Sequence, residues 1–191
     1  MNNAGETMEE FEARLDALLA QRREAMKTKY NRVLPTGELL FDRYKKAEYL
    51  QAGQDSSVYD TSVIMGDIKI GEHVWIGPYT LIEGINGMVT IGDFVSINSG
   101  VMIFTHDSTK YYVSGGKNPF KKGDVHIGSN TVIGSMSMIG CNVEIGSRCV
   151  VAAGSVVTKS IPDCTIVGGN PAIRIGQVCV LQDGTVEFEY D

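Results

Sequence analysis

The sequence lacks the patterns that mark several common classes of protein. It has no run of about 18 consecutive apolar residues, so no membrane-spanning helix is expected. Its first ten residues, MNNAGETMEE, are acidic and include no apolar signal core. A GxxxxGK phosphate loop, a nucleophile elbow and zinc-ligand spacings are also missing. These absences argue against a membrane protein, a P-loop nucleotidase, an α/β-hydrolase and a zinc enzyme.

Basic charge is scarce as well, because 17 Lys and Arg residues stand against 23 Asp and Glu residues, for a formal net charge of −6. Nucleic-acid binding is therefore not expected as the main task. The four cysteines include no CxxC pair, and they lie at Cys141, Cys149, Cys164 and Cys179. Free thiols in a chain without a signal favour the cytoplasm. A length of 191 residues suits one domain, or one domain with an appendage.

What the sequence does contain is a six-residue repeat. An aliphatic residue returns at every sixth position, and a small or short residue stands two positions before it, as Thr131 does before Ile133. The repeat is interrupted twice, and its aliphatic positions are Val58, Ile64, Ile70, Ile76, Ile82, Ile91, Ile97, Ile103, Ile127, Ile133, Ile139, Ile145, Val151 and Val157. Six residues turn a helix by about 600°, which would spread these side chains over every face. An even period instead keeps them on one face of a strand.

A unit this short cannot bury its own apolar side, so the units must stack on one another as a β-solenoid. Three units per coil would form a triangular prism with a column of aliphatic side chains inside. The sequence therefore predicts an all-β solenoid of parallel strands over residues 56–175.

This repeat resembles that of the hexapeptide-repeat acyltransferases. The resemblance implies a left-handed parallel β-helix, acetyl-CoA as the acyl donor, no metal, and a homotrimer whose sites lie between subunits. Around His106 the sequence is most similar to bacterial O-acetyltransferases that modify sugars and polysaccharides.

The segments on either side of the solenoid have patterns of their own. The pattern of residues 1–55 predicts two helices. The first covers residues 7–30, begins with a capping box of Thr7 and Glu10, and has amphipathic spacing. The second is shorter and runs to about Leu50, after a break at residues 35–37. These helices would cap the open end of the solenoid or contact the acceptor. Residues 176–191 alternate on either side of Asp183-Gly184 and predict a β-hairpin.

The two interruptions of the repeat are expected to meet. Three extra residues separate Ile82 from Ile91, and a longer excursion, the loop 104–124, separates Ile103 from Ile127. Counting units around a three-sided prism places Ile82 and Ile103 on one face, one coil apart. Both insertions then leave from one corner, and loops on a rigid scaffold often carry function. The alternative is two unrelated surface loops.

The chain has three histidines, and only one of them falls on this excursion. His73 and His126 are expected to face solvent or a neighbouring subunit. His106 is the candidate general base, because neutral imidazole suits proton removal near pH 7 and sugar acetyltransferases of the resembled group carry a histidine on such a loop. Asp107 is expected either to orient the imidazole ring or only to start a turn.

The shorter insertion supplies the candidate acceptor-binding residues. Glu83 and Asn86 are expected to hydrogen-bond sugar hydroxyls, or else to serve turn formation alone.

Candidate donor-binding residues follow from small residues on another corner. Ser135 and Ala153 are stacked small positions where the resemblance implies that the pantetheine arm lies, unless they only permit tight corner packing. Thr158 and Lys159 match the V-T-K segment of the resembled group near the nucleotide end. Arg174 is the nearby arginine, one position away from where relatives place a basic residue.

The leading functional hypothesis is an acetyl-CoA-dependent O-acetyltransferase acting on a carbohydrate, in the synthesis of lipopolysaccharide, capsule or exopolysaccharide. The first alternative is an N-acetyltransferase acting on an amino sugar nucleotide. A non-catalytic scaffold is a further alternative. A metal-dependent lyase, which shares the resembled fold, would need histidine ligands five residues apart, and no two histidines here have that spacing.

Overall fold

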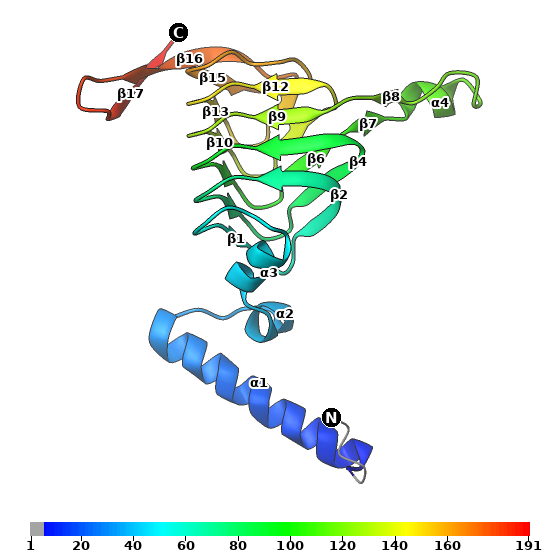
Figure 1. Ribbon diagram of the computed structural model, residues 1–191, viewed down its shortest axis with the longest axis vertical. Helices are drawn as coiled ribbons and strands as arrows, with labels where there is room; N and C mark the ends of the chain where they lie inside the picture. Colours follow the sequence, from blue (N-terminus) through cyan, green and yellow to red (C-terminus); the bar gives the residue numbers. More distant parts are fainter. Residues whose placement is uncertain (1–5) are drawn as a thin grey trace. The chain divides into compact units, whose positions relative to one another are not determined.

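The computed structural model describes residues 6–191, which form two compact units, one ending at Asp42 and the other comprising Arg43–Asp191 (Figure 1). The first unit is helical. Helix α1 (Met8–Tyr30) begins with the predicted capping box, since the amide of Glu10 donates to Thr7 Oγ1 and the amide of Thr7 donates to the Glu10 carboxylate. The predicted apolar stripe of α1 is only partly covered: Leu19 is buried, whereas Phe11 and Tyr30 are exposed.

The second predicted helix is wrong as a single element. It is divided into α2 (Thr36–Leu40) and α3 (Arg43–Tyr49), because Phe41 adopts an extended conformation, with φ −110° and ψ 130°. Helix α3 belongs to the second unit, where it packs against strand β1 and places Ala47 in the hydrophobic core.

The second unit is a parallel β-solenoid of three faces. The first face stacks short strands in the order β1 (Ser57–Val58), β3 (Trp75–Ile76), β5 (Ser96–Ile97), β10 (Val132–Ile133), β13 (Val150–Val151) and β15 (Thr165–Gly168). The other two faces form one continuous sheet that bends around a corner, because β2 (Val63–Ile70) and β4 (Leu81–Ile91) each run along both. The second face adds β6 (Met102–Phe104), β11 (Met138–Ile139) and β14 (Val156–Val157), and the third adds β9 (Val125–Ile127) and β12 (Val143–Ile145).

The register of these strands is the one that the six-residue repeat requires. Ile133 lies opposite Ile97 and Val151, and Ile139 lies opposite Ile103 and Val157. The repeated aliphatic side chains form the buried core, except Ile64 in the first coil, which is partly covered. Burying one such side chain contributes about 1.5–3 kcal/mol. The fold is thus the predicted left-handed parallel β-helix with helices before it.

The small polar residues two positions before the repeated aliphatic residues have a structural role at the corners of the solenoid. Several of their buried hydroxyl groups donate to carbonyl oxygens one coil further on, as from Thr131 Oγ1 to the oxygen of Gly146 (3.0 Å) and from Ser137 Oγ to that of Ala152 (3.0 Å). Others, such as that of Ser155, donate to a carbonyl oxygen three residues earlier in the same turn. A buried hydroxyl without such a partner would cost about 1–3 kcal/mol. The hydroxyl positions therefore fix the turns between faces.

The chain ends in the predicted hairpin. Strand β16 (Ile173–Val180) pairs antiparallel with β15 on one side and with β17 (Val186–Tyr190) on the other. The turn is held by Asp183, whose Oδ1 accepts from the amide of Thr185 at 3.0 Å.

Candidate active site

The two interruptions of the repeat lie against each other, as predicted. Ile82 on β4 is paired with Ile103 on β6, and Glu83 with Phe104, so both insertions begin at one corner. The amide of Asn86 in the shorter insertion donates to Thr105 Oγ1 in the longer one, at 3.2 Å. Two segments far apart in sequence thus build one site.

The longer insertion forms an arm, which is defined here as residues 105–124. Its base is a two-stranded antiparallel ribbon of β7 (His106–Asp107) and β8 (Lys121–Lys122), and helix α4 (Thr109–Val113) lies beyond it (Figure 1). Three aromatic rings pack together on the arm: Tyr111 and Tyr112 both contact Phe120, whose ring stacks on that of His106 with centroids 5.9 Å apart. The aromatic cluster therefore continues directly from the imidazole.

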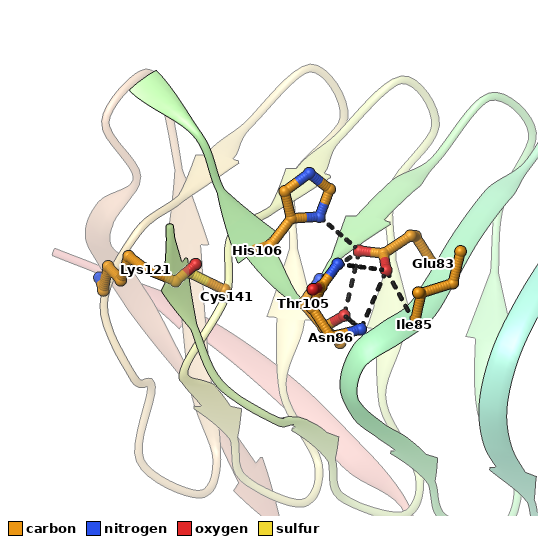
Figure 2. A network of polar contacts seen from close by, with 7 residues as sticks. All are labelled: Glu83, Ile85, Asn86, Thr105, His106, Lys121 and Cys141. Atoms are coloured by element: carbon orange, nitrogen blue, oxygen red, sulfur yellow. Dashed lines mark hydrogen bonds and ion pairs between the residues drawn. The ribbon is translucent and has the colours of Figure 1, made fainter. Parts of the chain in front are cut away.

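At the root of the arm, the carboxylate of Glu83 is the centre of a hydrogen-bond network (Figure 2). Glu83 is only 3% exposed, and both of its oxygens accept from the protein. Oε1 accepts from the amides of Ile85 (2.7 Å) and Asn86 (3.2 Å). Oε2 accepts from the amide and the hydroxyl of Thr105 (both 3.0 Å) and contacts Nδ1 of His106 at 2.9 Å.

These donors keep Glu83 ionised despite its burial. Burial alone raises the pKa of a carboxyl group, because it penalises the charged form. Here the hydrogen bonds from His106, from the amides of Thr105 and Ile85, and from the Thr105 hydroxyl outweigh burial and lower the pKa of Glu83 to about 2. At neutral pH the group is therefore a carboxylate that only accepts.

The carboxylate of Glu83 in turn determines which ring nitrogen of His106 carries a hydrogen. Because Glu83 Oε2 only accepts, Nδ1 of His106 must carry the hydrogen in the 2.9 Å contact. In the neutral ring, Nε2 is then the unprotonated nitrogen, and Figure 2 shows it on the side of the ring away from Glu83. The His106 side chain is 28% exposed, so this nitrogen is suited to accept a proton from a ligand.

Asp107 fulfils the second of its two expected roles. Its Oδ1 accepts from the amide of Thr109 at 2.8 Å, which starts helix α4. The hydrogen bonds from Thr109 lower the pKa of Asp107, and the charge of Lys121 contributes in the same direction. Nδ1 of His106 contacts Glu83 and not Asp107, so the first expectation, that Asp107 orients the ring, is wrong.

The two residues that were expected to bind the acceptor, Glu83 and Asn86, differ in their exposure. Glu83 is buried and its oxygens are occupied by protein donors, so its contact with a sugar would require breaking this network. Asn86 is partly exposed, and its Nδ2 lies 3.4 Å from Glu83 Oε1.

The expected donor residues do not come together within one chain. Ser135 and Ala153 lie at the corner before the second face, where the amide of Gly154 donates to the Ser135 carbonyl at 2.8 Å. Thr158 and Lys159 follow β14, at the corner from which the arm leaves β6. Arg174 lies on β16, where it forms an ion pair with Asp191 at 3.3 Å.

The other two histidines are exposed, as expected, and His73 stacks on Phe94. Among residues 6–191, no group of three or more His, Cys, Asp or Glu side chains is arranged to hold a metal ion. No helix in the same range is long and apolar enough to cross a membrane.

Sequence reasoning missed the coupling of Glu83 to His106. The pairing of Ile82 with Ile103 already placed Glu83 beside the start of the arm. It did not show that the chain turns there, so that the carboxylate points inward among backbone amides.

Comparison with known proteins finds relatives that share the six-residue repeat or are acetyltransferases by name. The family described as bacterial transferase hexapeptide (six repeats) matches residues 124–159. Serine acetyltransferase 4 of Arabidopsis thaliana is 37% identical over 123 residues, which cover 61% of this chain and 31% of that protein. The serine acetyltransferase of Buchnera aphidicola is 33% identical over 142 residues, which cover 72% of this chain and 50% of that protein. The chain thus spans about a third to a half of these curated relatives.

Two solved structures share the fold. A hexapeptide-repeat acetyltransferase from Vibrio cholerae, in complex with acetyl coenzyme A, has a TM-score of 0.62 and 27% identity, covering 91% of this chain and 93% of that chain. AntD, an N-acyltransferase from Bacillus cereus in complex with dTDP and 3-hydroxybutyryl-CoA, has a TM-score of 0.60 and 27% identity, covering 65% and 70%. In its repeat and in its fold, this chain is therefore similar to the hexapeptide-repeat acyltransferases, as its sequence implied.

Proposed function

We propose that this protein is an acetyl-CoA-dependent acetyltransferase that acts on a carbohydrate, with His106 as its general base. The observation that carries the proposal is the contact between Glu83 and His106: a buried, ionised carboxylate fixes the tautomer of a partly exposed imidazole at the root of an arm. A non-catalytic scaffold has no need of such a pair.

The pair suits acyl transfer from a thioester. His106 Nε2 takes the proton of the acceptor group while the acceptor oxygen or nitrogen attacks the thioester carbonyl carbon. The C–S bond then breaks, and the sulfur leaves as the thiol of coenzyme A once it receives a proton, which the imidazolium supplies. Glu83 stabilises the imidazolium between these two steps, because the charge on Nδ1–H faces a carboxylate at 2.9 Å. Glu83 is thus proposed as a positioning residue.

We also propose that the working enzyme is a homotrimer with its sites between subunits. His106 and the corner of Ser135 and Ala153 lie at opposite ends of the second face, so one chain offers the base at one corner and the small-residue groove at another. The surface between them is apolar: Val63 is 49% exposed and Met102 42% exposed on the outer side of this face. A neighbouring copy that covers this face would bring its own groove to His106. A backbone N–H near Ser135 would then be placed to stabilise the oxyanion.

The nucleotide end of the donor is proposed to contact Thr158, Lys159 and Arg174. The Lys159 side chain is exposed beside the corner of the arm. Arg174 would have to exchange its ion pair with Asp191 for a phosphate, and both of these side chains are about half exposed. An exposed pair of this kind contributes little, so the exchange costs little.

Two acceptor classes are proposed. The first is a sugar hydroxyl in the synthesis of lipopolysaccharide, capsule or exopolysaccharide in the cytoplasm, which follows from the sequence around His106. The second is the amine of an amino sugar nucleotide, which is favoured by the similarity to AntD, an N-acyltransferase solved with dTDP. Asn86, which is partly exposed beside the base, is the proposed contact for acceptor hydroxyls.

A thiol-release assay tests the function. The purified full chain is incubated with acetyl-CoA and a panel of sugars, sugar phosphates and amino sugar nucleotides, and free coenzyme A is followed with a thiol reagent. We expect release that depends on an acceptor from this panel. Release that is the same with and without every acceptor would contradict the proposal.

A further inference from the structure

The two faces of the β7–β8 ribbon differ in charge. In this antiparallel pair, His106 lies opposite Lys122, and Asp107 lies opposite Lys121. Residues directly opposite each other in an antiparallel pair project to the same face, and successive residues alternate between faces. One face therefore carries His106 and Lys122, and the other carries Asp107 and Lys121.

The hydrogen bonding of the ribbon brings the first of these pairs close. The amide of Gly123 donates to the carbonyl oxygen of Thr105 at 3.0 Å, so residues 105 and 123 occupy a hydrogen-bonding position of the ribbon. One ladder bond joins them, because the amide of Thr105 donates to Glu83. The next pair, His106 and Lys122, is then a non-hydrogen-bonded pair, in which the Cα atoms are about 4.5 Å apart and the side chains lie closer together. The stacking of Phe120 on His106 agrees, since residues 120 and 122 share a face.

The two lysines differ in what balances their charge. Lys121 faces Asp107, and its charge contributes to the lowered pKa of that carboxyl. Lys122 forms no hydrogen bond or ion pair with another side chain of residues 6–191, and it is exposed. The nearest acid along the chain, Asp124, turns its Oδ1 to the amide of Met88 at 2.8 Å. Lys122, the cross-strand neighbour of His106, thus has no acidic side-chain partner among residues 6–191.

We propose that Lys122 binds an anionic group of the acceptor, either a phosphate or a carboxylate, and that this protein acts on an acidic acceptor. The proposal rests on the proposed function and names the acceptor class for the same site. An ammonium group offers three donors to such an anion. The rings of Phe120, Tyr111 and Tyr112 continue from His106 on the arm and offer an apolar wall for the ring of the same ligand. An acceptor held by Lys122 and the wall would present its hydroxyl or amine to Nε2.

The test compares ligands that differ in charge, and it compares variants whose substituted lysines lie on opposite faces of the ribbon. Isothermal calorimetry with the full chain measures the binding of neutral glucose and of its anionic counterparts glucose 1-phosphate and glucuronate. The phosphate and the carboxylate arms distinguish the two anion types. The variants are Lys122→Gln and its matched control Lys121→Gln, which removes the same charge from the opposite face of the same ribbon.

We expect at least one anionic ligand to bind wild-type protein about tenfold or more tightly than its neutral counterpart, as a charge-assisted hydrogen bond allows. Lys122→Gln should bring the two affinities to within about twofold, and Lys121→Gln should leave the preference intact. Equal binding of all neutral and anionic partners, an absence of binding throughout, or equal loss in both variants would overturn the proposal. Calorimetry does not depend on turnover, so its outcome is separate from failure of the thiol-release assay.

Discussion

Replacing Glu83 by glutamine should destabilise the protein strongly, although the two side chains have nearly the same shape. The carboxylate accepts at both oxygens, with backbone amides of Ile85 and Asn86 on one side and Thr105 and His106 on the other. Glutamine can accept only at its oxygen. If that oxygen faces Thr105 and His106, the amide NH2 is directed at two backbone N–H donors, and neither side of that contact is satisfied.

The size of this loss of unfolding free energy can be worked out from the pKa of Glu83. The hydrogen bonds lower it from 4.5 to about 2. Because a shift of one unit corresponds to about 1.4 kcal/mol, the network favours the ionised over the neutral group by about 3 kcal/mol. The folded-state pKa lies below the unfolded one, so this contribution is fully present above pH 4.5 and is lost as the pH falls towards 2. Glu83→Gln should therefore lose about 3 kcal/mol of unfolding free energy at pH 7, and the deficit should be about 1 kcal/mol smaller at pH 3.5.

Equilibrium denaturation at a fixed protein concentration, at both pH values, measures this loss. Glu144→Gln is the matched control, because Glu144 is exposed on the third face; its unfolding free energy should stay within about 0.5 kcal/mol of wild type. An unfolding free energy of Glu83→Gln that equals that of Glu144→Gln at pH 7 would show that the hydrogen bonds to Glu83 do not stabilise the fold.

Three further outcomes follow from the fold and the proposed site. Ile139→Ala, in the middle of the buried column, should lower the unfolding free energy by about 2–5 kcal/mol in denaturant titrations, and a loss as small as that of an exposed site would contradict its burial. Light scattering at micromolar concentration should give the mass of three chains, and the mass of one chain would remove the argument for shared sites. Ala153→Trp should raise the KM for acetyl-CoA about tenfold or more in a protein that keeps the wild-type mass, because the ring would fill the proposed groove; an unchanged KM would show that the groove lies elsewhere.

The period of the sequence was sufficient to predict the solenoid, because the repeat is local and each aliphatic residue needs only to lie on one face of its own strand. Counting units also predicted that the insertions after Ile82 and Ile103 would meet. The same reasoning could not place the side chains within those insertions, because the arm no longer follows the period. It therefore assigned Asp107 to the ring as one alternative, whereas the inward turn after Glu83 gives that contact to Glu83.

In the helical segment too, a short-range feature could be predicted from the sequence and a longer-range one could not. The capping box of Thr7 and Glu10 is a short-range signal and was predicted correctly. The break at Phe41 lies next to the boundary between the two compact units, which no local pattern of residues 36–50 indicates.

The most direct test of the central claim is the turnover of His106→Ala at saturating acetyl-CoA, measured by thiol release with an acceptor that wild-type protein uses. His126→Ala is the control, because that histidine lies exposed on the third face. If His106 Nε2 is the general base, His106→Ala should lower turnover by about 10²–10⁴-fold while acetyl-CoA binds as before, and His126→Ala should retain nearly full turnover. Near-wild-type turnover of His106→Ala, on a sugar hydroxyl or on an amine, would show that His106 is not the general base.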